Sequence, residues 1–214
     1  MRSLFFASVL ALGAFASSAG ANTITGSLWH VPEALTFNAI PANIPGTTAD
    51  VTFEVNSPFN FTGNGATVGN WLASSAAFNI FENTVGTLGS LMDNGTVGTI
   101  LEFTGFVSVF TGQQFTVTHD DGLTLIIGGL DLGFNDGPTA PITSTATYTG
   151  PTGNFAFQLV YAECCGGPAV LQVDLPFTDT PEVPIPAALP LLLSGLGLLG
   201  GMGLRKKYKA SVAA

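Results

Sequence analysis

Carboxylates are the charged side chains of the region between Asn22 and Pro184, which holds all 14 acidic residues and no Lys or Arg. Without a cationic partner, each carboxylate must be solvated, accept hydrogen bonds or be neutralised by a metal ion. Hard oxygen ligands of this kind suit Ca²⁺. The negative field of the region also repels phosphate backbones, so nucleic acid is excluded as a partner.

The two cysteines, Cys164 and Cys165, are adjacent in sequence. Outside the cytoplasm the sequence allows a vicinal disulfide, two thiols or a cross-link between two chains. The favoured interpretation is a disulfide in a hairpin loop or a pair of unreacted thiols.

No set of residues has the pattern of a catalytic centre. The two histidines, His30 and His119, lack a G-x-S-x-G nucleophile motif, metal-binding spacing and a cationic oxyanion partner. His119 shares strand parity with Phe115 and Val117, which predicts a hydrogen-bonded packing residue, and His30 is expected near a strand end. Glycosidase chemistry needs two carboxylates at a defined separation, and among 14 acids some pair meets that requirement by accident. We expect a protein that is not an enzyme, and a secreted hydrolase is the least favoured alternative.

The elements that position these residues are predicted to be short strands. Apolar residues recur at every second position at Phe155–Tyr161 and Leu171–Phe177. Weaker alternation marks further candidates, and no long helical period precedes residue 185. Turn dipeptides with glycine separate the candidates: Asn94-Gly95, Asp121-Gly122, Asp136-Gly137 and Gly166-Gly167. About eight to ten strands at this spacing predict an all-β fold, a single β-sandwich or barrel over residues 22–180.

The N-terminal residues 1–21 have the pattern of a signal peptide. Arg2 precedes a short apolar run, and Ala19 and Ala21 fit the small-x-small rule for cleavage. The apolar run is too short to span a membrane comfortably. We therefore expect export and a mature chain that begins at Asn22.

The C-terminal residues have the pattern of a membrane segment. Residues 181–187 form a linker with Pro and acid, residues 185–204 carry no charge, and residues 205–214 begin with a basic cluster. Twenty apolar residues are enough for one transmembrane helix. The basic cluster predicts a cytoplasmic tail and an outside location for everything before residue 184. An ordinary single-pass anchor is the alternative to a sorting signal.

The tail resembles the PEP-CTERM sorting signal in its V-P-x-P-A variant. The matching residues are Val183, Pro184, Ile185, Pro186 and Ala187, followed by the span and by Arg205, Lys206 and Lys207. Ile185 stands where the family usually has Glu. The resemblance implies recognition by an exosortase, an inner-membrane intermediate, and a Gram-negative-type organism that produces exopolysaccharide.

Residues 98–177 resemble the protective-antigen-type β-barrel domain. The motif Phe115–Gly129 contains the Asp-Asp-Gly core, and Gly153–Glu163 with the following glycine-rich turn resembles the closing strands. In carbohydrate-binding members the paired Asp coordinates calcium, which bridges to sugar hydroxyls. The resemblance implies calcium ligands at Asp120 and Asp121, with Asn135 or Asp136 as a loop partner. The alternative is an Asp-Asp-Gly hairpin turn with both acids in water.

Two functions follow from these patterns. The first is a non-enzymatic cell-surface or extracellular-matrix protein that takes part in adhesion or in an exopolysaccharide biofilm. The second is a calcium-dependent carbohydrate-binding module. Under either function, the expected partners of the protein are an exosortase-type enzyme, the membrane and exopolysaccharide. No cofactor other than Ca²⁺ is expected.

Overall fold

The computed structural model describes residues 23–178. All of these residues belong to one compact unit. The predicted signal peptide, linker, sorting motif, transmembrane helix and basic tail lie outside the described residues. Within residues 23–178, no helix is long and apolar enough to cross a membrane.

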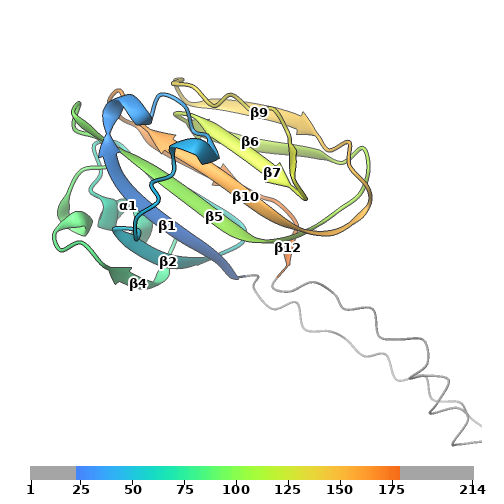
Figure 1. Ribbon diagram of the computed structural model, residues 1–214, viewed down its shortest axis with the longest axis horizontal. Coiled ribbons are helices and arrows are strands. Elements are labelled where there is room, and N and C mark those ends of the chain that lie inside the picture. The colour runs from blue at the N-terminus through green and yellow to red at the C-terminus, as the bar shows by residue number, and fades with distance from the viewer. Residues whose placement is uncertain (1–22, 179–214) are drawn as a thin grey trace, which may run out of the picture. The chain divides into compact units, whose positions relative to one another are not determined.

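Two antiparallel β-sheets form this part of the chain (Figure 1). The larger sheet has the strand order β4-β2-β1-β5-β10-β7-β8, with β12 also paired to β5, and the smaller has the order β3-β11-β6-β9. The strands are β1 Thr23–Pro32, β2 Val51–Asn56, β3 Phe59–Gly63, β4 Phe78–Glu82, β5 Val97–Val109, β6 Gln114–Asp120, β7 Leu123–Ile127, β8 Leu130–Asp131, β9 Ile142–Thr147, β10 Gly153–Glu163, β11 Ala169–Val173 and β12 Phe177–Thr178. The helical elements are the α-helix α1 Val68–Ser74 and the 3₁₀ turns η1 Glu33–Leu35, η2 Pro41–Asn43 and η3 Thr87–Gly89.

The all-β prediction is confirmed for the described residues, and the two sheets make the architecture a sandwich. Twelve strands are described, more than the eight to ten expected. The two additional strands, β8 and β12, are only two residues long, so no alternation of apolar residues marks them in the sequence. The strongest alternating run behaves as predicted, since Phe157, Leu159 and Tyr161 of β10 are all buried. The long strand β5 pairs with β1 on one side and β10 on the other, so it is the centre of the larger sheet.

The main core lies between the sheets and is aromatic. The ring of Phe61 from β3 stacks on Trp71 of α1 at a centroid distance of 4.2 Å, and Trp71 stacks in turn on Tyr161 of β10 at 5.8 Å. Trp71 and Tyr161 are each 0% exposed. Stacked rings add to the stabilisation from buried apolar area. This column therefore ties helix α1 and both sheets together.

A second, smaller cluster covers the outer face of the larger sheet. Val160 and Ala162 of β10 point away from the main core and pack with Trp29, Ile100 and residues of the segment between β1 and β2, including Ala39. Because β10 is buried on both faces near its end, residues of either parity are apolar there. The same segment brings Glu33 next to Cys165 and Ala39 next to Asp136.

Candidate functional site

Two connections between the sheets meet at one end of the sandwich. The corner Asp120–Gly122 leads from β6 in the smaller sheet to β7 in the larger one, and the loop Cys164–Pro168 leads from β10 in the larger sheet to β11 in the smaller one. The Asp120–Asp121 peptide bond is cis. Neither connection is a hairpin, so the alternative interpretation of Asp-Asp-Gly as a hairpin turn and the favoured hairpin loop at the cysteines are both wrong. The alternation of apolar residues and the turn residues indicate where a strand ends. They do not indicate which sheet the next strand joins.

Gly122 allows a third segment to approach this corner. A Cβ atom at Gly122 would lie 2.1 Å from the carbonyl oxygen of Asp136, so no other residue fits there. The amide of Leu123 donates to the carbonyl of Asn135 at 2.8 Å. The backbone of the Asn135–Asp136 segment therefore packs directly against the Asp121–Gly122 corner. The loop that holds the expected partner of the paired aspartates does lie beside them. The Asn135 side chain is exposed, and its Oδ1 accepts from the amide of Gly137. A metal-ligand role for Asn135 or Asp136 stays a prediction.

Both aspartates are buried, which contradicts a turn with both acids in water. The side chains of Asp120 and Asp121 are each 4% exposed. Asp121 is held by two backbone amides, with Oδ1 accepting from Thr139 at 3.0 Å and Oδ2 accepting from Cys164 at 2.8 Å. These two donors belong to different loops, so Asp121 joins the corner to both of its neighbours.

The Asp120 carboxyl is less well satisfied than that of Asp121. Burial, the charge of Asp121 and a hydrogen bond with the Asp121 carboxyl raise the pKa of Asp120 from 3.8 to about 7. Among residues 23–178, no backbone amide opposes this shift. The case of Asp121 differs, because burial raises its pKa and the amides of Cys164 and Thr139 counteract the rise. Adjacent carboxyls share a proton when no cation separates them. Asp120 is therefore the group of the pair that most lacks a positive partner.

A third buried carboxyl lies behind the pair. Glu163, at the end of β10, is 1% exposed, and burial raises its pKa from 4.5 to about 9. The Tyr161 hydroxyl donates to Glu163 Oε2 at 2.7 Å and also contacts the carbonyl oxygen of Asp120. Burial, together with the nearby Glu163 charge, raises the pKa of the Tyr161 hydroxyl well above its usual value. Near neutral pH this group of residues retains protons that solvated carboxyls would have lost.

His119 packs against the corner from β6, as predicted. Its side chain is fully buried, with Nδ1 2.6 Å from the carbonyl oxygen of Asp121 and Nε2 3.2 Å from Ser144 Oγ. A neutral imidazole with its proton on Nδ1 donates to that carbonyl and accepts from the serine. Burial lowers the pKa of His119, which favours this neutral form. His30 lies within β1, two residues before its end, and burial lowers its pKa as well.

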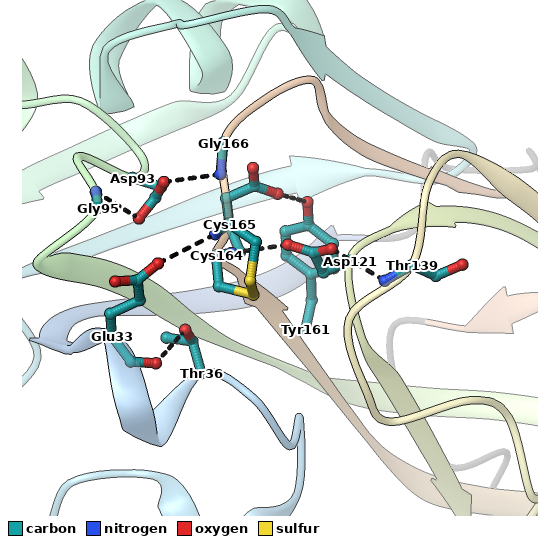
Figure 2. Close-up of a disulfide and its surroundings, with 11 residues drawn as sticks. Glu33, Thr36, Asp93, Gly95, Asp121, Thr139, Tyr161, Cys164, Cys165 and Gly166 are labelled. Atoms are coloured by element: carbon teal, nitrogen blue, oxygen red, sulfur yellow. Dashed lines mark hydrogen bonds between the residues drawn. A yellow bond between two sulfur atoms is a disulfide. The ribbon is translucent and has the colours of Figure 1, made fainter.

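Cys164 and Cys165 form a vicinal disulfide, one of the alternatives the sequence left open. Their loop is held by carboxylates, because three successive backbone amides each donate to an acid from a different part of the chain (Figure 2). The pairs are Cys164 N to Asp121 Oδ2 at 2.8 Å, Cys165 N to Glu33 Oε1 at 3.4 Å and Gly166 N to Asp93 Oδ2 at 2.9 Å. In a region without Lys or Arg, backbone amides thus supply the partners that these acids need.

An open cavity of about 380 Å³ lies between the two connections. Asp120 and Asp121 line one part of it, and the remainder is lined by residues with few polar side-chain atoms, together with Thr139. These residues are Pro138, Ala140, Pro141, Cys165, Gly166, Gly167 and Pro168. The cavity brings together the predicted residues Asp120, Asp121 and Cys165. It does not include Asn135 or Asp136 in its lining.

One group of three potential metal-ligating side chains is present among the described residues. It consists of Asp121, Cys164 and Cys165, whose oxygen and sulfur atoms lie within 4.8 Å of one another. Both sulfurs are in the disulfide, so they offer no thiolate to a metal. Oxygen atoms of Asp120 and Asp121 are the ligands that remain for a hard cation at this cavity.

Sequence reasoning missed Tyr161, Glu163 and Thr139 as site residues. Thr139 contributes through its backbone amide, for which the sequence holds no signal. The sequence did hold a signal for Glu163, because it lies on the same face of its strand as Phe157, Leu159 and Tyr161, which point into the core. An acid at an inward strand position is expected to be buried and to have a partner.

Comparison with known proteins gives no family assignment. No protein-family model matches the chain, and no curated protein matches it. Among solved structures, the PA14 domain of the antifreeze protein MpAFP is similar with 18% identity and a TM-score of 0.49, covering 79% of this chain and 98% of that one. A PA14 sugar-binding domain from an RTX adhesin is similar with 22% identity and a TM-score of 0.49, covering 71% and 88%. These similarities are too low to assign a function.

Proposed function

We propose that this chain is an exported surface or matrix protein whose β-sandwich binds Ca²⁺ through Asp120 and Asp121 and, through the ion, the hydroxyls of a carbohydrate. The observation that carries the proposal is the Asp120 carboxyl. It is 4% exposed, lies at a cavity beside a second carboxyl, and has no Lys or Arg available between residues 22 and 184. A divalent cation at this position supplies the missing positive charge.

The geometry of Asp121 supports the same proposal. Two amides from different loops fix its carboxylate, so the acid is oriented before an ion arrives. Preorganised ligands lose little conformational freedom on binding. Ca²⁺ takes six to eight oxygen ligands, of which two aspartates supply only some. Water, sugar hydroxyls and the proposed loop partners Asn135 or Asp136 are the sources of the others.

Calorimetry and thermal unfolding of the full chain with added Ca²⁺ test the ion site. We expect binding heat and a higher melting temperature, because an ion that binds only the folded state stabilises it by about 2.7 kcal/mol at a concentration 100-fold above Kd. Asp120→Ala and Asp121→Ala should each abolish both effects. Asp174→Ala, which removes an exposed acid away from the cavity, is the matched control and should change neither. Absence of heat together with an unchanged melting temperature in the wild type would sink the proposal.

The terminal segments support a proposed route to the cell surface. The motif Val183–Ala187, an apolar span and a basic cluster occur in the order of an exosortase-type sorting signal. We propose that the chain passes through the inner membrane of a Gram-negative-type bacterium and is then released to the surface or to an exopolysaccharide matrix, with no enzymatic activity of its own. Mass spectrometry of the mature protein from its host tests this route. We expect loss of the segment after residue 187, whereas an intact basic C-terminus in cells with an exosortase counts against it.

A further inference from the structure

We infer that the Cys164–Cys165 disulfide is the apolar platform of the site, and that the ligand is a neutral sugar unit with a hydroxyl edge and a C–H face. This inference rests on the proposed function, because it gives a role to the remaining residues that line the same cavity. It draws on three observations: the lining of the cavity, the position of the disulfide and the distribution of charge.

Two kinds of residue line the cavity. Asp120 and Asp121 are its acids, while Cys165 and the prolines 138, 141 and 168 have side chains with apolar surface. No aromatic side chain of residues 23–178 lines the cavity, so no ring is there for a sugar to stack on. A pyranose carries hydroxyls at its edge and C–H groups on its face, and it needs an apolar surface for that face. In this cavity Cys165 of the disulfide, Ala140 and the three prolines are the residues that offer one.

The disulfide is held beside the carboxylates. Its two sulfur atoms lie within 4.8 Å of a carboxylate oxygen of Asp121, and Cys165 is exposed whereas Cys164 is fully buried. Figure 2 shows the sulfur–sulfur bond next to Asp121, with the loop anchored to Asp93 and Glu33. Sulfur is soft and polarizable and packs well against apolar groups. Oxidation also removes both S–H donors, so the bridge offers contact area without a hydrogen-bond donor.

The charges around the cavity favour a neutral ligand. Two carboxylates balance the two positive charges of Ca²⁺, so the loaded pair has no net charge to attract an acid. Glu33 and Asp93 hold the loop from behind, and the domain has no Lys or Arg to receive a uronate or sulfate. Anions of this kind are normally recognised by Arg or Lys. The volume of about 380 Å³ lies at the small end of ligand cavities, which suits one sugar unit at the end of a glycan.

The test is calorimetry of the full chain, saturated with Ca²⁺, against a panel of methyl glycosides. The neutral members are the glycosides of mannose, galactose, glucose and fucose, and the acidic members are those of glucuronic and galacturonic acid. The variants are Cys164→Ser with Cys165→Ser, Asp120→Ala, and Asp174→Ala as the matched control. We expect the double serine variant to bind Ca²⁺ within about twofold of the wild type and to bind the preferred neutral glycoside at least about tenfold more weakly, which is a loss of about 1.4 kcal/mol.

Chemical reduction gives a second measurement that needs no substitution. A phosphine and one water molecule reduce the bridge: phosphorus supplies the two electrons that break the sulfur–sulfur bond, the water supplies the two hydrogens of the new thiols, and its oxygen forms the phosphine oxide. Mass spectrometry confirms the gain of two hydrogens. We expect the reduced wild type to behave like the double serine variant, and reoxidation to restore sugar binding.

Each other outcome overturns a definite part of the inference. Unchanged sugar binding in the double serine variant or in the reduced protein refutes the platform. Loss of Ca²⁺ binding in both of them also refutes it, because the disulfide would then act through Asp121. Preference for the uronic acids, or no binding to the whole panel by a calcium-loaded wild type, refutes the neutral-sugar assignment. A wild type that binds no Ca²⁺ refutes the proposed function itself, a result that the Ca²⁺ titration reports separately.

Discussion

The aromatic core and the acidic corner meet at one residue, Tyr161, although opposite forces govern the two regions. The Tyr161 ring stacks on Trp71 inside an apolar cluster, while its hydroxyl donates to Glu163 and contacts the Asp120 carbonyl. Burial of apolar area stabilises the core at any pH. Burial of carboxyls without a cation destabilises their charged forms, so Asp120 and Glu163 retain protons at a pH where solvated carboxyls have lost them. The core therefore stabilises the fold at every pH, and the acidic corner makes the stability depend on pH.

Removal of the central ring of the core is expected to have the largest effect. Trp71→Ala should lower the free energy of unfolding by about 3–5 kcal/mol, the usual result of emptying a buried aromatic site. Denaturant unfolding at two pH values, with and without Ca²⁺, measures this loss. The loss should be the same in all four conditions, because the Tyr161 ring on which Trp71 stacks carries a hydroxyl whose raised pKa keeps it protonated at both pH values. A loss that varied with pH or Ca²⁺ would mean that the two regions are coupled more strongly than their contacts indicate.

The acidic corner makes the opposite prediction, a stability that depends on pH. The folded-state pKa values of Asp120, about 7, and Glu163, about 9, lie above their unfolded values of 3.8 and 4.5. The folded state thus binds more protons, and its stability falls as pH rises through these folded values. The histidines, whose pKa is lowered, act in the opposite direction, but only below their unfolded pKa of 6.5.

The range from pH 7 to pH 9 therefore isolates the carboxyls. Without Ca²⁺, the free energy of unfolding should fall across it by about 2 kcal/mol, given at most about 1.4 kcal/mol per pH unit for each proton. Denaturant unfolding with a chelator present measures the slope. Glu163→Gln should flatten it, while Glu54→Gln, an acid near the opposite edge of the larger sheet, is the control. A stability that stays constant or rises over this range contradicts the account of the corner.

A single hydroxyl separates the two roles of Tyr161. Tyr161→Phe keeps the ring on Trp71 but removes the hydroxyl that donates to Glu163 and contacts the Asp120 carbonyl, so we expect a loss of about 1–2 kcal/mol. Tyr148→Phe is the matched control, because the Tyr148 hydroxyl makes one bond, to the carbonyl of Pro151, outside the corner. Thermal unfolding compares the two variants. Equal losses would remove the distinction between core and corner at this residue.

The exposed edge of the larger sheet is expected to show the smallest effect. Phe81 of β4 is 69% exposed and contributes neither to the core nor to the corner. Phe81→Ser should change the free energy of unfolding by less than about 0.5 kcal/mol. Denaturant unfolding with and without Ca²⁺ measures it. A larger change would show that this edge belongs to a third stabilising region.

The parts of this fold that sequence patterns predict are those with a regular period. Phe157, Leu159 and Tyr161 alternate because a strand places every second residue on one face, and their burial follows from that. His119 was placed inward by the same parity. The path of the chain between sheets has no such signal, so the Asp120–Gly122 and Cys164–Pro168 connections looked like hairpins. The carboxyl pair was found by residue type, but its burial depends on Thr139 and Asp136, which reach it through backbone atoms.

The loop at Cys164–Gly166 has a consequence for the conditions in which the domain keeps its shape. It is fastened by three hydrogen bonds from backbone amides to carboxylates, in a region that contains no Lys or Arg. Dissolved salt weakens attraction between pairs of exposed full charges far more than it weakens short bonds to neutral amides. Sodium chloride at high concentration therefore has no Lys or Arg ion pair to screen here, and it also relieves repulsion among the acids. The three hydrogen bonds of this loop should therefore persist at sodium chloride concentrations that weaken ion pairs between exposed side chains.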